Sequence, residues 1–267
     1  MLGIREPEPN GAEPAEADSG QLIGEADLGP DEPSPAAGER RLRFGTAVHG
    51  LLEWSARNRW ARPGRERCVA LLCQEGLDPA DGEVGRALEL VDGWLESELR
   101  ASLEGARVRL RPEMPFLLAI GASVVRGKMD LLAELSGGEL LVVDYKTDAL
   151  GDSGPETHAE RYATQRTLYA LAAASGAGRG EAGRNGEAPR IRTAYCFLEA
   201  PDEPYQQSFG PAELEAARGE IERLVAGVRS GRFEVTDKPH LALCHDCPAR
   251  ERLCSHPKER TMARLDR

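Results

Sequence analysis

The chain has 267 residues, of which 30% are charged and 5% aromatic, and its formal net charge at pH 7 is −11. No apolar run approaches the ~20 residues that a membrane-spanning helix needs, and the first residues lack the basic and then apolar order of a secretory signal. Six cysteines are too few for a disulfide scaffold in a chain of this length. We therefore expect a cytoplasmic protein with reduced thiols and no membrane partner.

The negative charge is concentrated in the first forty residues, which carry ten acidic side chains, two basic side chains and six prolines. A segment of this composition cannot form a core, so we expect an acidic, Pro-rich disordered tail over residues 1–40. Residues 41–267 have a net charge of only −3 and suffice for one domain, with a cysteine-rich segment over 241–258. The overall acidity therefore does not prevent this domain from binding an anion.

The predicted elements begin with a helix that Thr46 caps and whose apolar face includes Val48, Leu51 and Leu52. Five arginines between residues 57 and 67 form a segment that is either simply solvated or able to contact phosphates. Helical patterns follow over 66–76 and 82–101.

Strand patterns come next. One strand is predicted over 115–125, and the runs 127–135 and 139–145 are typical of a β-hairpin. A helix over 160–174 lies between polar, Gly-rich loops at 148–157 and 175–189, and the strands 191–198 and 205–209 precede an amphipathic helix over 211–229. This order favours an α/β fold with a central mixed β-sheet flanked by helices.

Two acids and a lysine stand in the predicted hairpin. Asp144 and Lys146 follow four apolar residues and project from the same face of a buried strand, and Asp130 lies in the strand before it. Charges at a partly dry strand end are costly unless they are compensated. A divalent cation held by both acids would compensate, and hard oxygen ligands suit Mg2+ or Mn2+. The alternative is an ordinary Asp–Lys pair on a solvated edge.

Other polar residues accompany these three. His49 and Glu53 are one turn apart on the first helix, and Glu113 precedes the first strand. Gln165 and Tyr169 are likewise one turn apart on the helix after the hairpin. Each has a purely structural explanation when taken alone, as a core histidine, a surface acid or a helix-core aromatic.

Five motifs follow one another along the chain: Gly45-Thr-x-x-His49-x-x-x-Glu53, Glu113-x-x-Phe116, Gly127-x-x-Asp130, Val143-Asp144-Tyr-Lys146-Thr and Tyr162-x-x-Gln165-x-x-x-Tyr169. In this order and spacing they resemble the PD-(D/E)XK nuclease superfamily, and most closely the C-terminal nuclease domain of the RecB and AddA helicase–nucleases. The resemblance covers about residues 45–250. Met129 stands where the superfamily's name has a proline.

The resemblance implies a restriction-endonuclease-like core and a metal-dependent deoxyribonuclease. It implies that the Mg2+ or Mn2+ ligands are His49, Asp130, Asp144 and the backbone carbonyl of Tyr145. It implies that the catalytic residues are Asp130, Asp144 and Lys146, the lysine positioning the attacking water. The residues that it places in contact with DNA or in support of the site are Glu53, Glu113, Gln165 and Tyr169.

The C-terminal segment carries Cys244, Cys247 and Cys254, and C-x2-C is a common metal-ligand spacing. The segment is similar to that of AddB-type iron–sulfur nucleases, in which a fourth cysteine precedes the first helix. No cysteine precedes Gly45 here. The alternatives are a 4Fe-4S cluster completed by Cys68 or Cys73, a Zn2+ site completed by His245 or His256, and three unligated thiols.

The leading hypothesis is a Mg2+-dependent DNA nuclease, expected to be an exonuclease, in double-strand-break processing and recombination repair. No P-loop motif is present, so we expect a module or fragment of a RecB/AddA-like helicase–nuclease, with DNA and a helicase subunit or domain as partners. The alternatives are a catalytically idle DNA-binding or scaffold module of a helicase complex and an iron–sulfur single-strand nuclease. The intact pair of acids and the lysine favour the enzyme.

Overall fold

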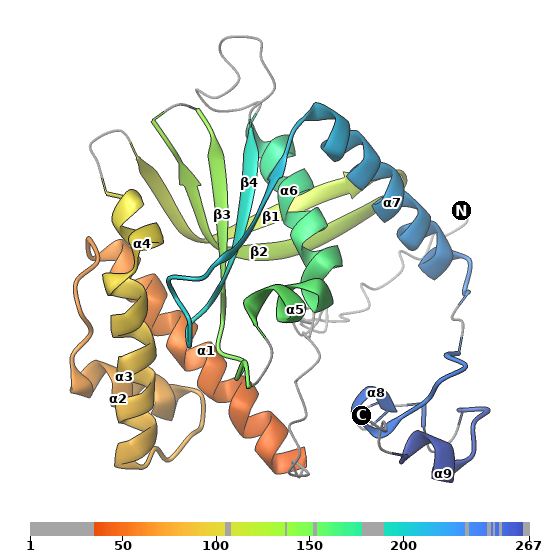
Figure 1. The fold of residues 1–267 in the computed structure, drawn as a ribbon, viewed down its shortest axis with the longest axis horizontal. Coiled ribbons are helices and arrows are strands. Elements are labelled where there is room, and N and C mark those ends of the chain that lie inside the picture. The colour runs from red at the N-terminus through yellow and green to blue at the C-terminus, as the bar shows by residue number, and fades with distance from the viewer. Residues whose placement is uncertain are drawn as a thin grey trace, which may run out of the picture.

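A five-stranded mixed sheet forms the centre of the molecule (Figure 1). The computed structural model describes residues 35–104, 108–136, 138–151, 154–177, 190–232, 235–244, 247, 249–250 and 253–263. The strands are β1 (Arg109–Ile120), β2 (Ser123–Glu134), β3 (Leu140–Lys146), β4 (Ile191–Phe197) and β5 (Tyr205–Phe209), in the order β1-β2-β3-β4-β5. Only β3 and β4 are parallel to each other. The prediction of an α/β fold with a mixed sheet is confirmed.

Helices cover both faces of the sheet (Figure 1). One face carries α1 (Pro35–Arg57), α2 (Arg65–Gln74), α3 (Asp81–Glu96) and α4 (Glu98–Ser102). The other carries α5 (Pro155–Ala159), the 3-10 turn η1 (Glu160–Tyr162), α6 (Ala163–Ala177) and α7 (Pro211–Arg229). The short helices α8 (Leu241–Cys244) and α9 (Lys258–Thr261) lie apart from the sheet. Among the described residues, no helix is long and apolar enough to cross a membrane.

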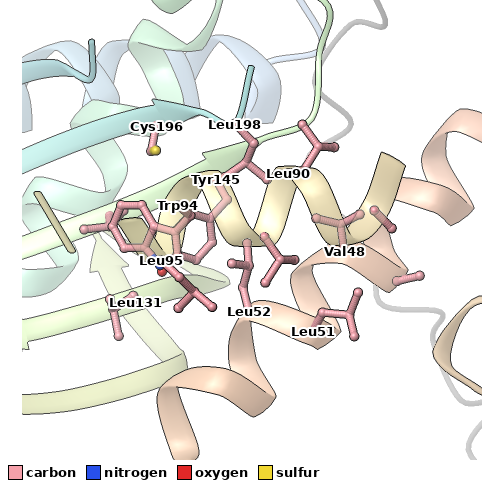
Figure 2. Close-up of a cluster of buried hydrophobic side chains, with 14 of the residues drawn as sticks. Val48, Leu51, Leu52, Leu90, Trp94, Leu95, Leu131, Tyr145, Cys196 and Leu198 are labelled. Carbon is pink, nitrogen blue, oxygen red and sulfur yellow. The ribbon is translucent and has the colours of Figure 1, made fainter. Parts of the chain in front are cut away.

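The larger core lies between α1, α3 and the sheet (Figure 2). Leu51 and Leu52 of α1 and Trp94 of α3 are fully buried there. The ring of Tyr145, from β3, packs edge-on against Trp94 with ring centroids 5.0 Å apart. This packing fixes α1 against the ends of β2 and β3, which is where the predicted site residues lie.

In the β1–β2 hairpin, the alternation of side chains between the two faces of the sheet is interrupted at Glu113 and Asp130. Residues two apart in a strand normally share a face. Here Leu131 packs on the side of α1 and α3, whereas Met129 packs with α6. Glu113 has a φ of +54°, a conformation that is rare and costs a non-glycine residue of order 1–3 kcal/mol. The hairpin therefore bends at the two acidic residues.

Three local predictions are wrong. Thr46 does not cap the first helix, because α1 begins at Pro35 and the Thr46 hydroxyl donates to the carbonyl of Leu42 at 3.1 Å. The strand predicted over 115–125 is interrupted by the β1–β2 turn, where Gly121 has a φ of +55°. The helix predicted over 82–101 breaks at Ser97, whose hydroxyl accepts from the backbone N–H of Arg100 and begins α4.

The other predicted elements agree with the structure to within a few residues. The hairpin of β2 and β3 is confirmed, and α7 has the predicted bounds. The last six residues of the predicted acidic tail, 35–40, belong to helix α1, and the rest of that tail lies outside the described residues. Residues 178–189 of the predicted Gly-rich loop also lie outside them.

Candidate functional site

Three elements bring potential metal ligands to one point. His49 comes from α1, Glu113 from β1 and Asp130 from β2, and one ligand atom of each lies within 4.8 Å of the others. The strand pairing explains the meeting of the two acids. The neighbouring pairs Pro112–Leu131 and Met114–Met129 place Glu113 directly opposite Asp130. Within the described part of the chain, this is the one cluster of at least three such side chains that is tight enough to hold an ion.

Asp130 is held from two sides. Its Oδ1 faces His49 Nδ1 at 3.4 Å, and its Oδ2 accepts a hydrogen bond from the backbone N–H of Tyr145 at 2.8 Å. Burial opposes the charged form of Asp130, but His49 and this hydrogen bond outweigh it and lower the pKa of the carboxyl. Burial likewise opposes a charged imidazole, and the negative charges of Asp130 and Asp144 nevertheless raise the pKa of His49 to about 9.

Asp144 forms an ion pair with Lys146 on the adjacent strand β3. Its Oδ2 lies 2.8 Å from Lys146 Nζ, and the carboxyl is buried. Burial raises the pKa of Asp144 to about 6, with the nearby Asp130 adding to the effect and Lys146 opposing it. In the register that pairs Leu131 with Val143, Asp144 is the next residue opposite Asp130. The two predicted catalytic acids therefore occupy neighbouring strands.

A polar and aromatic enclosure holds the Lys146 ammonium group. Lys146 Nζ donates to Gln165 Oε1 at 3.0 Å and lies 3.9 Å from the ring centroid of Tyr162. Gln165 in turn donates through Nε2 to the hydroxyl of Tyr169 at 2.9 Å. Ammonium groups are attracted to aromatic faces. Both Gln165 and Tyr169 were predicted to contact DNA or support the site. Gln165 contacts the lysine directly, and Tyr169 contacts Gln165.

Tyr195, which sequence reasoning missed, completes this enclosure from β4. Its ring centroid is 5.3 Å from Lys146 Nζ, and its hydroxyl donates toward Gln165 Oε1 at 3.3 Å and the carbonyl of Tyr162 at 3.1 Å. The parallel pairing of β3 and β4 places Tyr195 beside Asp144. No spacing rule within the sequence could connect the two residues, because the crossover between these strands is long.

The two predicted glutamates differ in position. Glu113 belongs to the ligand cluster and forms an ion pair with Lys128 of β2. Glu53 pairs instead with Arg57, one turn along α1, at 2.8 Å, and it is not part of that cluster. Each of the two clustered carboxylates, and the neighbouring Asp144, consequently has one cationic partner: Lys128 for Glu113, His49 for Asp130 and Lys146 for Asp144.

Tyr145 orients its surroundings through both backbone and ring. Its N–H binds Asp130, and its buried ring packs edge-on against His49 with centroids 6.0 Å apart. The imidazole therefore has a fixed aromatic neighbour on the core side. The role of the Tyr145 carbonyl as a metal ligand stays a prediction.

The arginine-rich segment 57–67 is largely neutralised by acidic neighbours. Arg62 lies between Asp92 and Glu96, at 2.6 Å from each, and Arg65 pairs with Asp81. These partners compete with phosphate for the same guanidinium groups, so the segment has less capacity to bind a polyanion than its composition suggests.

The cysteines occupy separate regions. Cys68 of α2 and Cys196 of β4 are both buried in the core. Helices α2 and α8 lie on opposite sides of α1 (Figure 1), so the fold does not bring Cys68 or Cys73 to the C-terminal cysteines as a fourth ligand. His256 Nε2 contacts the carbonyl of Thr236 and must therefore donate to it, and His245 lies outside the described residues.

Comparison with known proteins settles the family. A model described as the PD-(D/E)XK nuclease superfamily matches residues 24–254. The chain belongs to the PD-(D/E)XK nuclease superfamily. No curated protein is similar enough to match it.

Two solved structures resemble this superfamily member distantly. The "Putative exonuclease" from Eubacterium rectale is 15% identical over 85% of this chain and 78% of its own, with a TM-score of 0.49. The protein SSO0001 is 14% identical over 74% of this chain and 87% of its own, with a TM-score of 0.33. With both TM-scores below 0.5, neither likeness bears on function.

The donor set of this superfamily member fits a divalent cation. Carboxylate oxygens of Glu113 and Asp130 and one imidazole nitrogen of His49 converge, and the buried Asp144 is adjacent. Such a mixture, dominated by oxygen, suits Mg2+ or Mn2+. The described side chains therefore form a candidate metal site on the sheet of a PD-(D/E)XK superfamily member.

Proposed function

We propose that this protein is a divalent-metal-dependent deoxyribonuclease that hydrolyses phosphodiester bonds and acts as an exonuclease. The observation that carries the proposal is the convergence of His49, Glu113 and Asp130 next to the Asp144–Lys146 pair. Mg2+ or Mn2+ would be held by His49, Asp130 and Asp144, with Glu113 as a further ligand. When bound, such an ion supplies charge neutralisation at phosphate and lowers the pKa of a water molecule.

The chain's own residues supply the remaining chemistry. The Lys146 ammonium group is a fixed positive charge beside the acids, and it stabilises the negative charge that develops on a phosphate during hydrolysis. Gln165 and the rings of Tyr162 and Tyr195 hold the ammonium in place, so little reorganisation is needed when the substrate arrives.

We further propose that the enzyme works in double-strand-break processing and recombination repair, as a module of a RecB/AddA-like helicase–nuclease. This part of the proposal rests on the motif resemblance. The three C-terminal cysteines stay candidates for a 4Fe-4S cluster or Zn2+, and absorption near 400 nm together with iron and zinc analysis of anaerobically purified protein tests them.

A cleavage assay with Asp144→Asn tests the nuclease proposal. Linear single strands, linear duplexes and circular single strands of DNA, all labelled, are incubated with Mg2+, Mn2+ or EDTA. We expect metal-dependent loss of the linear substrates, intact circles, and a cleavage rate about 10²–10³-fold lower in the variant. The exposed Glu220→Gln substitution in α7 is the matched control.

The outcomes separate the parts of the proposal. Equal cleavage by wild type and Asp144→Asn would remove this site as the source of activity. Rapid cutting of circles would replace exonuclease with endonuclease action. Absence of cleavage together with retained DNA binding would favour a catalytically idle module.

A further inference from the structure

The outer face of the β1–β2 hairpin leads away from the ligand cluster, and no described part of the chain covers it. Beyond the bend at Glu113 and Asp130, every second residue of both strands is exposed: Pro115, Leu117, Ala119, Val124, Arg126 and Lys128. We call these six residues the arm face. The opposite face of the same hairpin, which includes Leu118 and Ile120, packs against α6 and α7.

The arm face combines exposed apolar side chains with two positive charges, of which Lys128 is paired with Glu113. Leu117 is 75% exposed and Val124 is 66% exposed. Residues 114–129 contain two basic side chains and no acidic one, in a chain whose net charge is −11. Unlike Arg57, Arg62 and Arg65, Arg126 has no ion pair or hydrogen bond within the described residues. An exposed apolar surface on an edge hairpin promotes aggregation unless a partner covers it. Its presence here therefore indicates a binding surface.

We propose that the arm face is the track along which a single strand of DNA approaches the site. The inference rests on the proposed nuclease function and adds the surface that receives the substrate. Arg126 and Lys128 contact phosphates, and Leu117 and Val124 contact the faces of unstacked bases and sugars. In a duplex the base faces are stacked away from the protein, so the apolar part of this surface favours a single strand.

The spacing along the arm suits successive nucleotides. Side chains on one face of a strand repeat every ~7 Å, so Lys128 and Arg126 stand about 7 and 14 Å along the strand from Asp130. Because an unstacked strand extends further than the ~3.4 Å per nucleotide of a duplex, these positions correspond to phosphates no more than about two and four nucleotides from the one at the ligand cluster. Lys128 is also the ion-pair partner of Glu113, which makes the arm face continuous with that cluster.

Binding of labelled DNA to the full chain tests the proposal. Fluorescence anisotropy with a 12-nucleotide single strand and a 12-base-pair duplex, in EDTA to prevent cleavage, gives affinity as a function of salt. We expect Arg126→Ala to weaken single-strand binding severalfold and to reduce the slope of log affinity against log salt by about 0.7. We expect Leu117→Ser to weaken binding severalfold without changing that slope.

Two substitutions on α7 are matched controls. Arg223→Ala and Val228→Ser remove the same kinds of exposed side chain from the helix on the other face of the arm, and both should bind like wild type. Melting temperatures of all four variants check that the fold is kept.

The results distinguish the arm from the nuclease proposal. If both arm variants bind DNA as tightly as wild type while cleavage still depends on Asp144, the arm face is not the DNA track, and the nuclease proposal stands. A loss confined to the duplex would also overturn the single-strand track. A wild-type protein that neither binds nor cleaves DNA would overturn both.

Discussion

Metal binding by this protein should expel a proton from His49. The pKa of His49 is about 9, because the carboxylates of Asp130 and Asp144 outweigh the effect of burial, so at pH 7 about 99% of the imidazole is charged. An imidazole binds a metal only in its neutral form. Removing the proton at pH 7 therefore costs about two pKa units, or roughly 3 kcal/mol of binding free energy.

The sign of the pH dependence follows from that shift. His49 has a higher pKa in the folded protein than its ordinary 6.5, so its ion pair with Asp130 stabilises the metal-free fold below pH ~6.5, and this contribution is lost as the pH rises through 9. Metal affinity has the opposite trend. It should rise close to tenfold per pH unit from 7 to 8 and level off above 9.

Titration calorimetry in two buffers of different ionisation enthalpy measures the protons released. We expect about one proton per ion at pH 7, mainly from His49, because Asp144, with a pKa of about 6, is then mostly ionised. At pH 6 the release should be larger, because Asp144 is then partly protonated. His49→Gln should release less than half as much at pH 7. A metal affinity that does not change between pH 7 and 9 would refute the assignment of His49.

Three further predictions concern packing and the site. Gly127→Ala should lower the free energy of unfolding by about 1–3 kcal/mol, because a Cβ there would come within 2.5 Å of the Phe116 ring. Gly85→Ala in α3 should raise it by up to ~1 kcal/mol, because a Cβ there meets open space. Thermal unfolding of both variants tests the contrast. Tyr195→Phe should cost about 1 kcal/mol and lower the cleavage rate with DNA affinity unchanged, and an unchanged rate would exclude Tyr195 from lysine positioning. Saturating Mn2+ should raise the melting temperature of wild type but much less that of Glu113→Gln, and equal shifts would remove Glu113 as a ligand.

Much of the fold could be predicted from periodicity. The amphipathic pattern of α7 and the hairpin signal between β2 and β3 were sufficient, because each element is stabilised by residues close in sequence. The start of α1 was missed because its first turns are not an apolar stripe. They are held by ion pairs such as Arg40–Glu83, between residues 43 positions apart.

The site was predictable in part for the same reason. Asp144 and Lys146 are two residues apart on one strand, and that spacing is visible in the sequence. The place of Glu113 beside His49 depends on a hairpin register and on one positive φ, and neither leaves a local signal. Tyr195 reaches Lys146 only through the parallel pairing of β3 and β4. These contacts are tertiary, so propensity and spacing could not reveal them.

Glu113, Asp130 and Asp144 are each paired with one cationic side chain of the protein. This charge balance affects both the storage of the metal-free protein and the attraction of substrate. Lys128, His49 and Lys146 leave the neighbourhood of the three carboxylates close to electroneutral before any ion enters. Exhaustive chelation should therefore leave a well-folded protein that tolerates storage. Loading it with a doubly charged ion in exchange for one proton turns that neighbourhood electropositive by about one unit, so the loaded form should attract a polyanion from solution more strongly than the stripped form.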